Sequence, residues 1–115
     1  MKDDRLYLLH ILESAEKIVS YTQEGRDVFL ATPLIQDAVV RNFQIIGEAA
    51  KKVSITLKSE YPHIRWREIA GFRDILTHKY MSVDMEEIWI IIHNELPELL
   101  ESVRMILERY SLGIK

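Results

Sequence analysis

Apolar side chains recur at intervals of three and four residues through most of the chain, the repeat of helices that bury one face. The first such stretch follows Asp3 and Asp4, and acidic side chains favour the start of a helix. Its buried face is expected to comprise Leu8, Leu12, Ala15 and Val19. Only four glycines and three prolines occur in 115 residues, fewer turn residues than a many-stranded fold requires. The chain is therefore predicted to be all-α.

A second, longer helix is predicted to begin at Thr32 and Pro33, because threonine can cap a helix whose first residue is proline. Asp37 and Arg41, four residues apart, are expected to pair on its surface. Gly47 predicts a close approach of neighbouring backbone, since glycine otherwise costs about 1 kcal/mol inside a helix. The apolar face of this helix is expected to comprise Ile35, Val39, Ile46, Ala49, Ala50, Val53 and Leu57.

Tyr61 and Pro62 interrupt the repeat, and a short third helix is predicted from about residue 64 to residue 77. Its core face is expected to contain Ile69, Phe72 and Leu76.

The last helix is predicted to begin at Asp84, with Glu87 placed three residues later as in a capping box. Pro97 disfavours helical geometry at Leu96 and predicts a kink or break near residues 93–96. The apolar seam of this helix is expected to comprise Ile88, Ile92, Leu96, Leu99, Val103, Ile106 and Tyr110. The chain is thus predicted to be one domain, residues 1–115, built as a bundle of about four main helices.

Composition narrows the classes of function. The chain has no cysteine, which excludes disulfides, thiolate metal sites and cysteine nucleophiles. Its longest uninterrupted aliphatic and aromatic run, residues 88–92, is far shorter than the roughly 20 residues of a membrane span, and the N-terminal residues do not resemble a signal peptide. A cytoplasmic location without membrane contact is expected.

A positive charge balance is confined to one segment of a chain whose net charge is −3. Residues 61–82 carry four Lys or Arg against two Asp or Glu, whereas residues 83–115 carry three against seven. The chain as a whole therefore lacks the basic character typical of nucleic-acid binding, and any anion site must be local.

The basic segment contains the side chains best suited to chemistry. Arg73 is expected at the edge of an apolar helix face, where its stem can cover apolar surface while its head reaches water or a carboxylate. His78 follows five residues later, about 140° around a helix, so the two would not share a face. Asp74 and His78 are four apart and do share one, which fits either an aspartate that orients a catalytic imidazole or an ordinary surface pair.

The stretch RDILTHKY, residues 73–80, has the order arginine, four residues, histidine, one residue, tyrosine. It resembles the motif of HEPN-domain proteins of the HepT type, which are RNase toxins paired with small MntA-type nucleotidyltransferase antitoxins. The flanking sequence is similar as well, in RNFQIIGEAAKKVS from Arg41, the Pro62 to Trp66 step, MSVDMEEIW and Leu96-Pro97, and covers about residues 33–99. Asp74 stands where such proteins often have asparagine.

This resemblance implies a HEPN-like bundle that dimerises, so that both copies of Arg73 and His78 line one cleft. Gly47 and the apolar seam of the last helix are expected to supply nonpolar surface for that dimer. The implied activity is RNA cleavage without a metal or cofactor. His78 would deprotonate the 2′-hydroxyl, Arg73 would hold the phosphate, and Asp74 and Lys79 would support them.

The resemblance also implies that the partner nucleotidyltransferase adenylylates Tyr80 and thereby neutralises the toxin. The alternative is a non-catalytic dimeric HEPN module that binds the partner or a nucleotide. His10, His63 and His93 lack a second ligand at metal spacing, so no metal site is expected. Glu48, Lys51 and Lys52 are expected to be solvated or salt-bridged, although Glu48 could support the motif from a neighbouring helix. Trp66 and Trp89 are expected to belong to the core.

Overall fold

The computed structural model describes residues 4–111, and within them every regular element is a helix. The elements are α1 (Asp4–Tyr21), α2 (Arg26–Ala31), α3 (Pro33–Lys52), α4 (Ile55–Glu60), α5 (Trp66–His78), the 3-10 turn η1 (Tyr80–Ser82), α6 (Met85–Asn94) and α7 (Leu96–Ser111). The predicted all-α class is confirmed.

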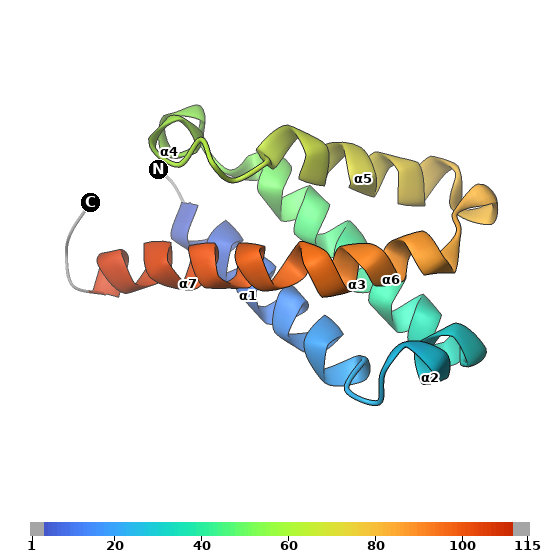
Figure 1. Cartoon of the computed structure of the whole chain (residues 1–115). Coiled ribbons are helices and arrows are strands. Elements are labelled where there is room, and N and C mark those ends of the chain that lie inside the picture. Colours follow the sequence, from blue (N-terminus) through green and yellow to red (C-terminus); the bar gives the residue numbers. More distant parts are fainter. Residues whose placement is uncertain (1–3, 112–115) are drawn as a thin grey trace.

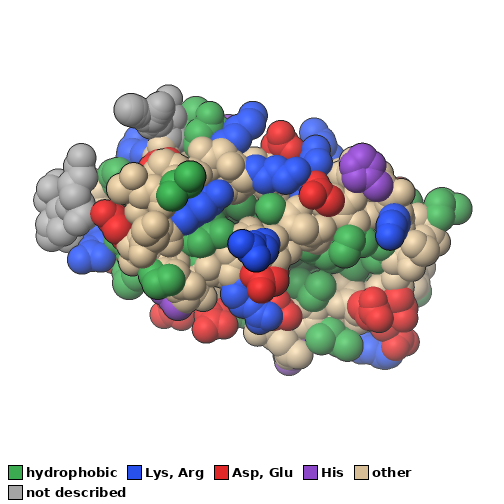
Figure 2. Space-filling model, turned by 90° about the horizontal axis from the view of Figure 1, so that it is seen from above, with side chains coloured by type: hydrophobic (Ala, Val, Ile, Leu, Met, Phe, Trp, Pro, Cys, Tyr) green, Lys and Arg blue, Asp and Glu red, His purple; other side chains and the backbone are tan. Residues whose placement is uncertain are grey.

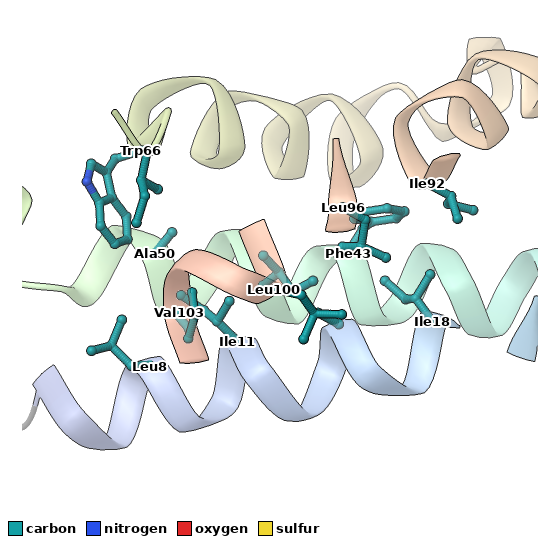
Figure 3. Close-up of a cluster of buried hydrophobic side chains, with 14 of the residues drawn as sticks. Leu8, Ile11, Ile18, Phe43, Ala50, Trp66, Ile92, Leu96, Leu100 and Val103 are labelled. Atoms are coloured by element: carbon teal, nitrogen blue, oxygen red, sulfur yellow. The ribbon is translucent and has the colours of Figure 1, made fainter. Parts of the chain in front are cut away.

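Helix α3 is the centre of the bundle. It packs against α1 on one side and α5 on the other, while α7 lies against α1 and α6 continues along the line of α7 (Figure 1). Figure 3 shows how the buried side chains fill the space between these helices, with Leu8 and Ile11 of α1 near Val103 of α7 and Phe43 of α3 near Leu96. One hydrophobic cluster runs through all the long helices.

The second helix is shorter than predicted. It ends at Lys52, and Ser54 starts the separate helix α4 by accepting a hydrogen bond from the Leu57 backbone N–H at 3.1 Å. Asp4 fixes this junction, since its carboxylate accepts bonds from the Ser54 N–H at 2.8 Å and from the Ser54 hydroxyl at 2.6 Å. The expected helix through Leu57 was wrong because a serine that can bond to the backbone competes with helix continuation.

The start of α3 also differs in detail. Pro33 is its first residue, as predicted, but the Thr32 hydroxyl donates to the carbonyl of Val28 at 2.6 Å and does not cap α3. That carbonyl belongs to α2, a six-residue helix that the sequence pattern did not indicate.

The last helical segment is broken where Pro97 predicted. Helix α6 ends at Asn94 and α7 begins at Leu96, with Pro97 in its first turn, where a missing N–H costs nothing. Asp84 caps α6 by accepting a bond from the Glu86 N–H at 3.0 Å. The apolar seam continues across this break, because Ile88 before it and Leu96 and Val103 after it are at most 1% exposed.

Two expectations about surfaces need correction. On α1 the core position is Ile18, which is fully buried, whereas Val19 is 43% exposed. Most of the nonpolar surface expected at a dimer interface is used within the chain, since the last seam is buried except for the half-buried Leu99 and Tyr110, and Gly47 packs against α5. In the part of the chain that the structure describes, none of the helices has the length and apolar character needed to cross a membrane.

Candidate functional site

The basic segment, residues 61–82, contains the whole of α5, and the RDILTHKY motif within it occupies the second half of α5 and the turn that follows. Arg73 lies in the body of the helix, His78 is its last residue, Lys79 caps it through a backbone N–H bond to the Ile75 carbonyl at 2.8 Å, and Tyr80 begins η1. Seen from above in Figure 2, Lys or Arg and Asp or Glu side chains alternate over this side of the molecule, so no large field of one sign forms.

Gly47 lets α5 approach α3 closely at the position of Arg73. A Cβ added at Gly47 would overlap the Cβ of Arg73 and lie 2.8 Å from its Cγ and 3.2 Å from the Ile69 carbonyl oxygen. Any larger residue would push Arg73 away from α3. The close packing predicted from Gly47 is confirmed: the backbone brought near is the Ile69 carbonyl, and the side chain that lies over the glycine is that of Arg73.

The guanidinium of Arg73 is held by two carboxylates. Its Nη2 pairs with Glu48 Oε1 at 2.9 Å, and its Nη1 donates to Asp74 Oδ1 at 3.1 Å. Lys51 Nζ reaches the same Asp74 oxygen at 2.8 Å. We call Glu48, Lys51, Arg73 and Asp74 the arginine cluster. Its formal charge is zero, and it orients Arg73, whose side chain is 25% exposed.

Asp74 stays ionised in this cluster. The hydrogen bond from Lys51, followed by that from Arg73, lowers the pKa of Asp74 below its ordinary value and outweighs the opposing effect of burial. Glu48 was expected to be solvated or salt-bridged, or to support the motif from a neighbouring helix, and it contacts Arg73 from α3. A glutamate by itself does not indicate which residue it contacts. The position of Glu48 directly after Gly47, where a neighbouring helix was expected to pack closely, was the available signal in the sequence.

His78 is exposed at the end of α5 and, within residues 4–111, its ring makes no hydrogen bond to a side chain or backbone group. The Asp74 carboxylate that could have oriented His78 is bound by Lys51 and Arg73 instead. Asp74 and His78 therefore form neither a catalytic pair nor a surface pair. Because α5 is continuous from residue 66 to 78, Arg73 and His78 lie about 140° apart around the helix. A single chain therefore does not bring them together on one face.

The Tyr80 hydroxyl donates a hydrogen bond to Asp37 Oδ1 at 2.9 Å, and the tyrosine is 38% exposed. That bond, with smaller contributions from burial and from the charge of Asp37, raises the pKa of Tyr80 above its ordinary value. The expected surface pair of Asp37 with Arg41 is absent from the ion pairs of residues 4–111, because the carboxylate faces η1.

Asp37 is the site residue that sequence reasoning missed. It lies on the same stripe of α3 as Arg41 and Glu48, at steps of four and seven residues, and this polar stripe was the available signal. Lys79 is exposed beside His78 and forms no ion pair within the described chain. Residues 4–111 also contain no group of three His, Cys, Asp or Glu side chains placed to hold a metal ion.

Comparison with known proteins finds relatives that align with most of the described chain. Residues 11–106 match the family model described as Ribonuclease HepT-like. A Methanocaldococcus jannaschii protein, named as a gamma-glutamylcyclotransferase with a provisional RNase assignment, is 43% identical over 108 residues. That alignment takes in 93% of this chain, which spans about half (49%) of the relative's length.

Two further relatives match over most of both lengths. A Caldanaerobacter subterraneus protein with a provisional RNase name is 37% identical over 110 residues, 95% of this chain and 98% of that protein. A Thermococcus cleftensis protein named as a probable ribonuclease HepT is 39% identical over 94 residues, 81% of this chain and 86% of that protein. No solved structure matches the chain significantly.

Proposed function

Because the chain belongs to the HepT-like ribonuclease family, we propose that it is a metal-independent endoribonuclease toxin that acts in the cytoplasm and is neutralised by a small nucleotidyltransferase partner. The observation that carries the proposal is the arrangement of Arg73, held by the arginine cluster, five residues before an exposed His78. Relatives that align with 95% and 81% of the chain bear RNase names.

The proposed reaction is attack of the RNA 2′-oxygen on the adjacent phosphorus. His78 accepts the 2′-hydroxyl proton, the O2′–P bond forms, and the P–O5′ bond breaks as water protonates the leaving oxygen. The products are a 2′,3′-cyclic phosphate and a 5′-hydroxyl. Arg73 uses two of its five N–H donors on Glu48 and Asp74, so others are left for the phosphoryl oxygens. Lys79, exposed beside His78, adds positive charge.

The proposed active site is shared between two protomers. Arg73 and His78 diverge on one helix, and a two-fold axis near the end of α5 would bring Arg73 of one protomer to His78 of its partner. Exposed apolar side chains within and directly after the motif support an interface there: Ile75 is 48% exposed and Met81 is 94% exposed.

Cleavage assays test the proposed catalytic roles. Arg73→Ala and His78→Ala are expected to stay folded and lose RNA cleavage, and the wild-type reaction is expected to survive EDTA and to slow at acid pH, where histidine takes up a proton. His63→Ala is the control, because this exposed histidine lies outside the motif, where its Nε2 is hydrogen-bonded to the Ser102 hydroxyl at 3.3 Å. Full activity in His78→Ala would reject its role, and no cleavage by the wild type would favour the non-catalytic module.

Neutralisation is proposed to occur by adenylylation of Tyr80. Its hydroxyl is at the protein surface, and an added AMP would bring negative charge beside a segment with a formal balance of only +2. After co-expression with the partner, intact mass is expected to rise by one or more AMP units in the wild type and not in Tyr80→Phe. Tyr21→Phe is the matched control, since Tyr21 is 40% exposed. An adduct on another residue would refute the assignment.

A further inference from the structure

A groove that Arg73 helps to line runs along α3 between α1 and α5. Its volume is about 370 Å³. Arg73 and Thr77 form the α5 wall, Tyr7 and His10 form the α1 wall, and one face of α3 is the floor. Figure 1 shows α3 lying between the other two helices, which makes such a groove possible. The proposed catalytic arginine is therefore one point on a longer surface.

Unpaired positive charge collects in this groove. Its lining contains Arg41, Lys52 and Arg73, and its one carboxylate, Glu48, is already paired with Arg73 at 2.9 Å. Arg41 and Lys52 take part in none of the ion pairs of residues 4–111, whereas the adjacent Lys51 is bound to Asp74. The groove thus carries an excess of two positive charges in a chain whose net charge is −3.

The spacing of these cations fits a polymer better than a single nucleotide. Arg41 and Lys52 are eleven residues apart on α3, three helical turns, so they share a face and lie roughly 16 Å apart along the axis. Arg73 packs against Gly47, which lies between them. The three cations therefore follow a line that several successive phosphates can occupy.

The end of the groove near Lys52 also has an aromatic wall. The half-buried Tyr7 ring stands edge-on to His10 with centroids 6.5 Å apart, and Lys52 Nζ lies 6.0 Å from the Tyr7 ring centroid. Lines of cations beside aromatic rings are typical of surfaces that bind single-stranded nucleic acid without reading its sequence.

We propose that this groove binds the RNA strand that extends away from the scissile phosphate, with Arg41 and Lys52 contacting successive phosphates and Tyr7 contacting a base. This inference rests on the proposed ribonuclease function and adds the path of the substrate. It makes substrate length important, because an oligonucleotide reaches Lys52 while a dinucleotide at Arg73 does not.

Binding of a fluorescein-labelled, unstructured 12-nucleotide RNA tests the groove, with His78→Ala as the non-cleaving background and anisotropy measured at several salt concentrations. Adding Arg41→Ala or Lys52→Ala is expected to weaken binding about 3- to 10-fold and to reduce the slope of log K against log salt by about 0.7 for each lost phosphate contact. Lys58→Ala on α4, outside the groove, is the matched control and should change neither quantity.

Unchanged affinity and salt slope in Arg41→Ala and Lys52→Ala would overturn the inference. If the same variants bind RNA normally but no longer bind the nucleotidyltransferase, the groove is a protein-docking surface and the inference is wrong. If the wild type cleaves RNA and the Arg41→Ala and Lys52→Ala substitutions leave the KM for RNA unchanged, the groove inference is refuted while the proposed ribonuclease function stands. Absence of both RNA binding and cleavage in the wild type refutes the proposed function, and the groove inference with it.

Discussion

At the scale of single residues, the first and last side chains of the motif, Arg73 and Tyr80, are each held by a carboxylate from α3. Glu48 pairs with Arg73, and Asp37 accepts the hydrogen bond of Tyr80. The effects of the two contacts differ. The arginine gains a fixed direction, whereas the tyrosine is kept in its neutral form, since a nearby carboxylate raises the pKa of Tyr80 and opposes loss of the phenolic proton. Adenylylation of Tyr80 would have to break or use the bond to Asp37.

The titration of Tyr80 is a prediction at this scale. Because the pKa of Tyr80 is raised in the folded protein, the bond to Asp37 contributes stability below about pH 10 and loses it as the pH rises through the raised pKa. Ultraviolet titration of the wild type minus Tyr80→Phe should isolate this hydroxyl and place its pKa above the ordinary value. Asp37→Asn is expected to move that pKa down, and an unmoved pKa would show that Asp37 is not its cause.

At the scale of elements, the approach of α3 to α5 depends on the absence of a side chain at Gly47. Two glycines lie inside these helices, but a Cβ at Gly71 would meet nothing within 4 Å, whereas one at Gly47 would collide with Arg73. Helix propensity favours alanine at both positions by about 1 kcal/mol. Only at Gly47 does close packing oppose an alanine side chain. Comparing alanine substitutions at Gly47 and Gly71 therefore separates the effect of packing from the effect of helix propensity.

Gly47→Ala and Gly71→Ala are therefore predicted to have opposite effects. Overpacking at Gly47 is expected to lower the free energy of unfolding by about 1–2 kcal/mol net and to displace Arg73, reducing RNA cleavage. Gly71→Ala is expected to raise stability by about 0.5–1 kcal/mol with activity retained. Urea unfolding of both variants beside the wild type measures the difference. Equal stability changes in the two would contradict the close contact at Gly47.

At the scale of the whole molecule, the proposed function requires Arg73 and His78 to reach the same phosphate. Arg73 and His78 point in different directions from α5, because five residues correspond to about 140° around the helix. An active site that uses both side chains within one chain is therefore disfavoured. A composite site needs a second copy placed near the ends of α5 and η1, where Ile75 and Met81 are exposed.

Mixing two inactive variants tests this arrangement. Arg73→Ala and His78→Ala chains that exchange subunits form mixed dimers in which one of the two composite sites contains both intact residues. Activity is expected to recover to about one quarter of the wild-type level, since about half of the dimers are mixed and each has one site. Each variant incubated alone is the control. No recovery despite a mixed dimer detected by native mass spectrometry would place both residues in one chain.

The sequence alone determined the features that depend on neighbours a few positions away. Apolar spacing located the long helices, and the order of Arg73, His78 and Tyr80 indicated the family. Asp84 marked a helix start because its carboxylate can accept a backbone N–H bond, and Pro97 marked a break because proline has no N–H to donate. Tertiary structure decided what depends on how helices cross. It assigned Asp37 to Tyr80 across 43 residues, Asp4 to Ser54 across 50, and the core position on α1 to Ile18 in place of Val19. Helical periodicity defines a face but not the partner that covers it, and the partner is set only when the helices pack.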